Sequence, residues 1–231
     1  MIRKFVLLAL LLALYETVAL AQSSIETNIN LRNKVEKIIN KYLTVKGLEL
    51  KPGLEMKDAL QHFESKGASR SEYFDMVKSE YGIYDLKGTF FSRRNCSIRI
   101  VPTANNKAIV GIISINFPDG NSFKKLKEEY DILKSSLKEK YYIFSSKESF
   151  DNDYINETTS DYLKLSALSK DEGLFETRFY VSDNEASLLL GQIVLKISHV
   201  TVDYQTTYYV SLTYSTSDDI IEQLSSQEDD L

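Results

Sequence analysis

The stretch that decides the predicted fold is IVGIISINF (residues 109–117), PDGNS (118–122) and FKKLKEEYDILKSSLKEKY (123–141). In its first part the large apolar residues of one parity lie on one face of a pleated strand: Ile109, Ile113, Ile115 and Phe117. In the second part Asp119-Gly120 favours a turn, and Asn121 or Ser122 can cap a helix. Together these parts predict a strand that ends in a short turn.

The third part predicts a long amphipathic helix. Its apolar residues recur at spacings of three and four and form one buried stripe: Phe123, Leu126, Tyr130, Leu133, Leu137 and Tyr141. Lys and Glu occupy the opposite side. Because strand and helix each have a face to bury, the pattern predicts a sheet with this helix, residues 122–141, packed across it. The pattern indicates no chemistry.

Residues 22–84 predict an N-terminal helical section. Amphipathic helices are expected over residues 31–42, 54–66 and 73–82, the second after a Pro52-Gly53 break and the third ending at Gly82.

Residues 85–216 predict a mainly antiparallel sheet, because period two with one polar face is typical of strands solvated on one side. Strands are expected over residues 86–91, 96–102, 175–181, 193–197 and 208–214, with a further start at Leu163 and Leu165. Residues 145–160 predict a long exposed loop, Asp183-Asn184 a hairpin turn, and 217–231 an acidic tail with one or two helical turns. The fold class is therefore α+β. Three strands around a central glycine in each half leave an internal duplication open as an alternative.

The first 21 residues predict a cleaved signal peptide. Arg3 and Lys4 precede an apolar run over residues 5–15, and Ala19-Leu20-Ala21 is a small-x-small cleavage site. A membrane anchor needs roughly 20 apolar residues, and Glu16 interrupts the run. We therefore expect an exported protein, periplasmic or secreted, that does not span a membrane after cleavage.

Composition narrows the function classes. The 231 residues carry a formal charge of −5, and such an acidic surface disfavours binding to nucleic acid. The one cysteine cannot form an internal disulfide. The two histidines are too few for a His-rich metal site, so we expect no metal and no cofactor.

Candidate catalytic groups are weak. His62 and His199 occupy positions that ordinary structure explains, and Cys96 shares its strand parity with Ile98 and Ile100, which is typical of a buried apolar residue. The segment 151–157 faintly resembles a calcium loop but lacks the required Gly and distal Glu. Neighbouring acid pairs indicate solvated charge rather than a two-carboxylate site.

The 15 tyrosines are the compositional oddity. Tyr180 and Tyr209 fall on the outward parity of their strands, with Arg178 and Lys196 beside them. Exposed Tyr and Arg are typical of contact surfaces, so these four residues are the candidate binding residues. Tyr is also a good strand former, which is the competing explanation.

Several motifs resemble a family of exported, uncharacterised proteins of Gram-negative gut bacteria. They are LELKPG (residues 48–53), DLKGTFF (85–91), the C-x-I-x-I pattern of residues 96–100, and VGIISINFP with the helix that follows. The chain departs from the family by ending this region in Lys140-Tyr141-Tyr142, without the usual Gly and Pro. The resemblance implies export and fold. A weaker likeness, in architecture alone, is to the β-lactamase-inhibitor-protein-like fold.

Two hypotheses of function follow. The first is a non-catalytic binding or envelope-associated protein that contacts an unknown protein or ligand through a sheet face or loop. The alternative is an exported enzyme of unrecognised type that uses Cys96 or the acidic loop at 151–157.

Overall fold

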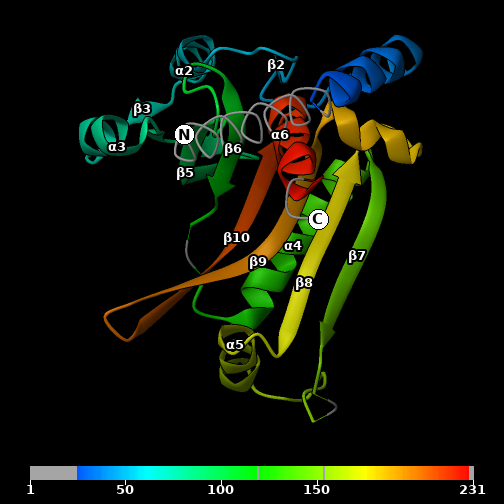
Figure 1. The fold of residues 1–231 in the computed structure, drawn as a ribbon. Coiled ribbons are helices and arrows are strands. Elements are labelled where there is room, and N and C mark those ends of the chain that lie inside the picture. Colours follow the sequence, from blue (N-terminus) through cyan, green and yellow to red (C-terminus); the bar gives the residue numbers. More distant parts are fainter. Residues whose placement is uncertain (1–24, 119, 153, 229–231) are drawn as a thin grey trace, which may run out of the picture.

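The computed structural model describes residues 25–118, 120–152 and 154–228, so the predicted signal peptide lies outside the described residues. The predicted α+β class is confirmed. A large antiparallel sheet forms the body of the molecule, and helices pack on it (Figure 1).

The N-terminal section contains the three predicted helices and strands that were not predicted. A helix covers residues 25–39, followed by the hairpin of β1 (Thr44–Val45) and β2 (Leu48–Glu49), then α2 (Met56–Ser65), β3 (Ser69–Arg70) and α3 (Phe74–Tyr81). The first helix ends before residue 42 because Asn40 adopts a left-handed backbone, φ 44°, and donates its N–H to the carbonyl of Glu36. Its expected apolar stripe is only partly buried, since Ile38 is 78% exposed.

The remaining elements build the sheet and its cover. They are β4 (Tyr84–Phe90), β5 (Arg93–Pro102), β6 (Val110–Asn116), α4 (Phe123–Lys138), β7 (Tyr142–Phe150), α5 (Asp161–Ser169), β8 (Gly173–Tyr180), the 3-10 helix η1 (Glu185–Leu190), β9 (Gln192–Val202), β10 (Gln205–Ser215) and α6 (Ser217–Glu228). The strand order is β3-β4-β5-β6-β10-β9-β8-β7. Two consecutive meanders therefore meet at the β6–β10 pair.

One face of the sheet, which we call the α4 face, holds the core. The whole predicted stripe of α4 is buried there, as are the strand residues of the inward parity, among them Ile113, Ile115, Phe179, Leu195 and Leu212. α4 lies against β8, β9 and β10. The buried hydroxyl of Tyr130 forms a hydrogen bond of 2.6 Å with that of Thr177, which satisfies both polar groups inside the core.

The opposite face, which we call the open face, is polar. One cross-strand row reads Lys147, Glu176, Lys196, Ser211, Asn116, Ser97 and Lys87 from β7 to β4. α6 covers only one end of this face, where Asp219 contacts Ser215 and where Ile220 and Ile221 are buried. In Figure 1 α6 and α4 lie on opposite sides of the sheet.

Three hairpins turn through two residues, and both residues of each turn have positive φ: Lys46-Gly47, Phe91-Ser92 and Asp203-Tyr204. Tight hairpins prefer this geometry because its twist matches that of the strands, and Asn-Gly is the usual sequence. Phe91-Ser92 is an unfavourable sequence for such a turn, because a residue with a side chain costs roughly 1–2 kcal/mol in the left-handed region.

The predicted loop over residues 145–160 is wrong in its first part. Residues up to Phe150 belong to β7, which pairs with β8. This strand escapes detection because Ser146 and Glu148 face α4 yet are polar. Their partners are also polar: Ser146 bonds Thr177 at 2.8 Å, and Lys134 of α4 pairs with Glu148.

The predicted strand start at Leu163 and Leu165 is also wrong, because both residues belong to α5. The Ser160 side chain caps this helix by accepting the N–H of Leu163 at 3.4 Å. A short apolar alternation fits a helix as well as a strand, and the cap decides the outcome.

Two further boundaries differ from prediction. Asp183-Asn184 is not a hairpin turn: Asn184 caps η1 by accepting the N–H of Ala186 at 2.9 Å, and η1 forms most of the β8–β9 connection. The acidic C-terminal segment contains a longer helix than expected, because α6 extends to Glu228 and buries apolar residues against the sheet and η1.

Candidate functional site

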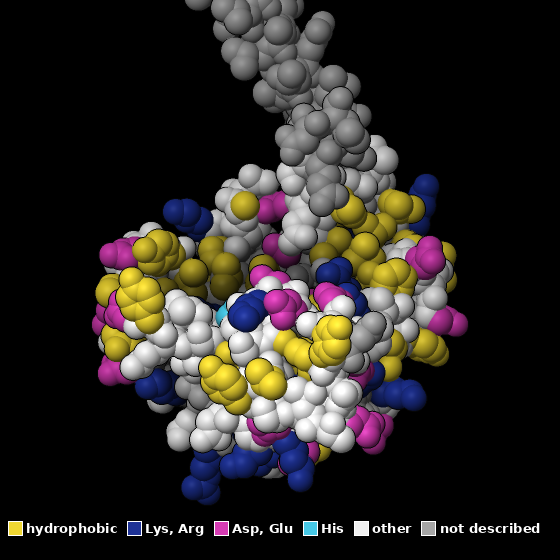
Figure 2. Space-filling view, turned by 90° about the horizontal axis from the view of Figure 1, so that it is seen from below, with side chains coloured by type: hydrophobic (Ala, Val, Ile, Leu, Met, Phe, Trp, Pro, Cys, Tyr) yellow, Lys and Arg dark blue, Asp and Glu magenta, His cyan; other side chains and the backbone are white. Residues whose placement is uncertain are grey.

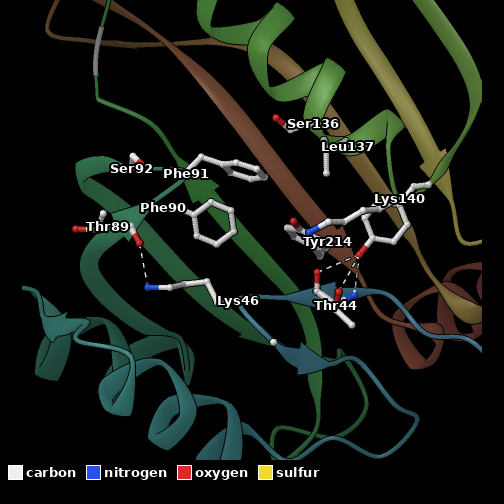
Figure 3. A pocket seen from close by; sticks show the side chains of 12 residues that line it. Thr44, Lys46, Thr89, Phe90, Phe91, Ser92, Ser136, Leu137, Lys140 and Tyr214 are labelled. Atoms are coloured by element: carbon white, nitrogen blue, oxygen red, sulfur yellow. Dashed lines mark hydrogen bonds between the residues drawn. The ribbon is translucent and has the colours of Figure 1, made fainter.

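A cavity of about 430 Å³ opens beside the last turn of α4. We call it the hairpin cavity because the turns of the β1–β2 and β4–β5 hairpins form two of its walls (Figure 3). Its lining residues are Thr44, Lys46, Gly47, Thr89, Phe90, Phe91, Ser92, Ser136, Leu137, Lys140, Tyr141 and Tyr214. This volume is in the range that binds small organic molecules.

The floor of the cavity is apolar and rigid. Phe90, Leu137, Tyr141 and Tyr214 are each at most 6% exposed. The Tyr141 hydroxyl is engaged by Thr44, from whose backbone N–H and side-chain hydroxyl it lies 3.1 Å. These contacts fix the β1 wall to the end of α4.

Tyr214 differs from Tyr141 in having no hydrogen-bond partner. Its side chain is 2% exposed, and its hydroxyl forms no hydrogen bond with any residue that the structure describes. Burial raises the pKa of Tyr214, and the nearby Tyr141 raises it further, so the phenol stays protonated. Among the described side chains, the fully buried polar atom without a partner is Arg32 Nε and not the Tyr214 hydroxyl. Tyr214 lines the cavity, and its hydroxyl can donate to an acceptor placed there.

Two lysines stand at the mouth. The ammonium of Lys46 donates to the carbonyls of Thr89 at 3.0 Å and Lys66 at 3.4 Å, which leaves one of its three N–H groups unused. Lys140 extends its side chain over the cavity toward Tyr214 (Figure 3). Within the described part of the chain neither lysine has a carboxylate partner, and the cavity lining contains no acid.

The backbone around the cavity is strained. Lys46, Phe91 and Ser92 have φ values of 50°, 44° and 64°. Left-handed residues other than glycine concentrate at functional sites, where the surrounding structure holds them. In Figure 3 the rings of Phe90 and Phe91 stand on one side of the cavity and Leu137 on another, so the costly turn places an aromatic ring at the site.

The four predicted binding residues lie on the open face, as their parity predicts, but not as one exposed cluster. Glu176 pairs with both predicted cations: its carboxylate lies 2.8 Å from Arg178 Nε and 3.9 Å from Lys196 Nζ. The two positive charges therefore share one carboxylate inside the face.

The expectation that Tyr180 is exposed is wrong, because it is 5% exposed. A β-bulge between Ile143 and Ser145 turns Phe144 toward it. The two rings stack with centroids 4.6 Å apart at an interplanar angle of 24°. An aromatic neighbour on the edge strand, which the sequence pattern of β8 cannot reveal, covers this residue.

Tyr209 remains half-exposed, beside a second hollow of about 520 Å³ on the open face. Asn95, Ser97, Arg99 and Asn116 are among the other lining residues. Seen from below, hydrophobic side chains on the surface form separate patches between charged ones (Figure 2), and scattered exposed apolar residues are normal.

The structure separates the candidate catalytic groups. Cys96 is fully buried and lies 3.4 Å from the carbonyl of Arg93, and burial raises the pKa of its thiol. Strands β6 and β10 lie between Cys96 on β5 and His199 on β9, so the two side chains cannot form a thiolate pair. His62 Nε2 lies 3.1 Å from the carbonyl of Lys46, a structural contact.

The acidic loop gives no metal centre in the part that the structure describes. Asp151 pairs with Lys147 at 3.0 Å, and Asp153 lies outside the described residues. Among those residues no cluster of His, Cys, Asp and Glu is arranged to hold a metal ion.

The comparisons with known proteins add no relative: no protein-family model, curated protein or solved structure matches the chain. Among the described helices none is long and apolar enough to cross a membrane.

Sequence reasoning missed the hairpin cavity, since its walls come from segments far apart in the chain. The one local signal is Phe91-Ser92 in place of a turn-forming pair between two strands.

Proposed function

We propose that this protein is an exported, non-catalytic binding protein, periplasmic or secreted, and that its ligand site is the hairpin cavity. The single observation that carries the site is the preformed cavity itself, about 430 Å³ in volume, whose lining combines aromatic rings with the lysines Lys46 and Lys140. Support for export is the N-terminal sequence pattern.

Binding has more support than catalysis. The lining groups of the cavity are aromatic rings, hydroxyls and two lysines, without a carboxylate, imidazole or thiol that could act as base or nucleophile. The alternative, an exported enzyme that acts through Cys96, is disfavoured by the burial of that thiol and its raised pKa, because a reactive cysteine needs a lowered pKa and access.

The proposed site is tested with a substitution that fills the cavity. Ser136→Phe places a ring in the space, whereas Ser135→Phe adds the same ring to an exposed position one residue away on α4. We expect naphthalene derivatives, titrated into leucine-labelled protein, to shift the methyl resonances of Leu137. Ser136→Phe should abolish the shift and Ser135→Phe should keep it.

The circular dichroism melting curves of both variants establish that they fold. Equal binding by both folded variants, or no shift of Leu137 with any probe in the unmodified protein, would overturn the proposed site.

A further inference from the structure

The charges around the hairpin cavity support an inference about its ligand, which rests on the proposed function. We infer that the ligand is a small organic carboxylate with an apolar ring or short chain, whose body lies on the aromatic floor and whose carboxylate meets Lys140, Lys46 and the Tyr214 hydroxyl.

The charges of the residues that line the cavity indicate that the ligand is an anion. Lys46 and Lys140 bring two positive charges to a cavity whose lining contains no acid. Two cations near the cavity differ in being paired: Arg93 with Glu129 at 2.7 Å and Lys51 with Glu49 at 2.9 Å. Glu49 and Glu139 line an adjoining hollow, which Lys140 and Tyr141 also border, but they do not line the hairpin cavity. An uncompensated pair of ammonium groups favours an anion.

The hydrogen-bond donors of the cavity indicate that the polar group of the ligand is an acceptor. A protonated phenol without a partner at the floor and an unused ammonium N–H at the mouth are both donors. A carboxylate accepts from both kinds of group through its two oxygens. The carbonyl groups that could compete for Lys46 are already bonded to it.

The apolar body follows from the floor and walls. Phe90, Phe91 and Leu137 surround the space that Lys140 reaches across (Figure 3). Flat aromatic walls favour a ring or a short chain. A bare inorganic anion would leave this apolar surface in contact with water.

The test uses three probes of one shape: 1-naphthoate, 1-naphthamide and 1-naphthylmethylammonium. We expect Kd values from the Leu137 methyl shift to favour the carboxylate over the amide by about tenfold and over the cation by more. Raising the salt concentration should weaken binding of the carboxylate and leave that of the amide unchanged.

Three variants separate charge from hydrogen bonding. Lys140→Ala should bring the affinity for the carboxylate close to that for the amide. Lys46→Asn should do the same, and Asn tolerates the left-handed backbone at this position. Tyr214→Phe should weaken the carboxylate and the amide alike, because both present an acceptor oxygen. Lys107→Ala, an exposed lysine outside the cavity, is the control and should change nothing.

The outcomes are distinguishable. Equal affinity for the three probes overturns the inference and leaves the proposed binding site standing. A preference for the carboxylate that survives in Lys140→Ala also overturns it, even if Lys46→Asn fails to fold. The absence of any Leu137 shift overturns both proposals.

Discussion

The two faces of the sheet are made by the same strands and have opposite characters. On β10, Leu212 faces α4 and is fully buried, while the next residue, Thr213, lies on the open face between Ser114 and Val194. Neighbouring residues therefore have different roles, because side chains alternate along a strand. The α4 face holds the molecule together, and the open face is free to tolerate change.

The largest expected effect tests this contrast on one strand. Leu212→Asp places a charge in the core and should cost about 4 kcal/mol or more, a large part of a stability of about 5–15 kcal/mol. Thr213→Asp, the same new side chain on the open face, should cost about 1 kcal/mol. Urea denaturation of both variants is the measurement, and similar losses would show that the two faces do not differ as described.

A smaller effect concerns the one end of the open face that is covered. Asp219 lies in the first turn of α6, and its burial raises its pKa to about 6. Hydrogen bonds from Ser215 and Gln223 lower the pKa, and the charge of Glu222 raises it. The folded state therefore prefers the neutral acid, and the stability that this preference provides is present below about pH 4 and lost as the pH rises through 6.

Asp219→Asn should accordingly raise the free energy of unfolding at pH 7 by about 1–3 kcal/mol and remove this part of the pH dependence between pH 4 and 6. Urea denaturation at four pH values compares the variant with the unmodified protein. A variant that is less stable than the parent at pH 7 would contradict the assignment of a burial penalty at this end.

The smallest effect is expected where the open face is uncovered. Tyr209→Ala removes a half-exposed ring and should change the free energy of unfolding by less than about 1 kcal/mol. The matched change on the other face, Tyr130→Ala, removes a fully buried ring and should cost about 3–5 kcal/mol. Thermal melts of the pair sharpen the comparison, and a large loss for Tyr209→Ala would mean that this tyrosine belongs to a packed layer.

The sequence predicts the elements whose pattern is unambiguous. All six positions of the predicted stripe are buried, five on α4 and Tyr141 just after it, and β6 and β8 follow their predicted parity. β7 could not be predicted, because its residues that face α4, Ser146 and Glu148, are satisfied by ion pairs and hydroxyls instead of apolar contacts. A search for alternating apolar residues misses a strand whose inward side chains are polar and have polar partners.

The candidate site was less predictable than the fold. The parity of Tyr180 and Tyr209 is correct, yet exposure also depends on a neighbouring strand, and Phe144 covers only the first of them. The hairpin cavity combines Lys46, Phe91, Lys140 and Tyr214, which no local spacing connects. Only the pairing of distant strands brings such residues together.

The meeting of the two meanders at β6 and β10 has a consequence for how the chain reaches its fold. Asn116 and Ser211 are paired although they lie 95 positions apart, whereas the strands on either side pair mostly with sequence neighbours. Local hairpins close early and long loops close late. Until β6 meets β10, the apolar face of the first meander is incompletely covered, whereas the second meander already supplies β8, β9 and β10, the strands against which α4 lies. We therefore expect the joining of the two meanders to be a late step, and a chain delayed before it to be the species most exposed to aggregation.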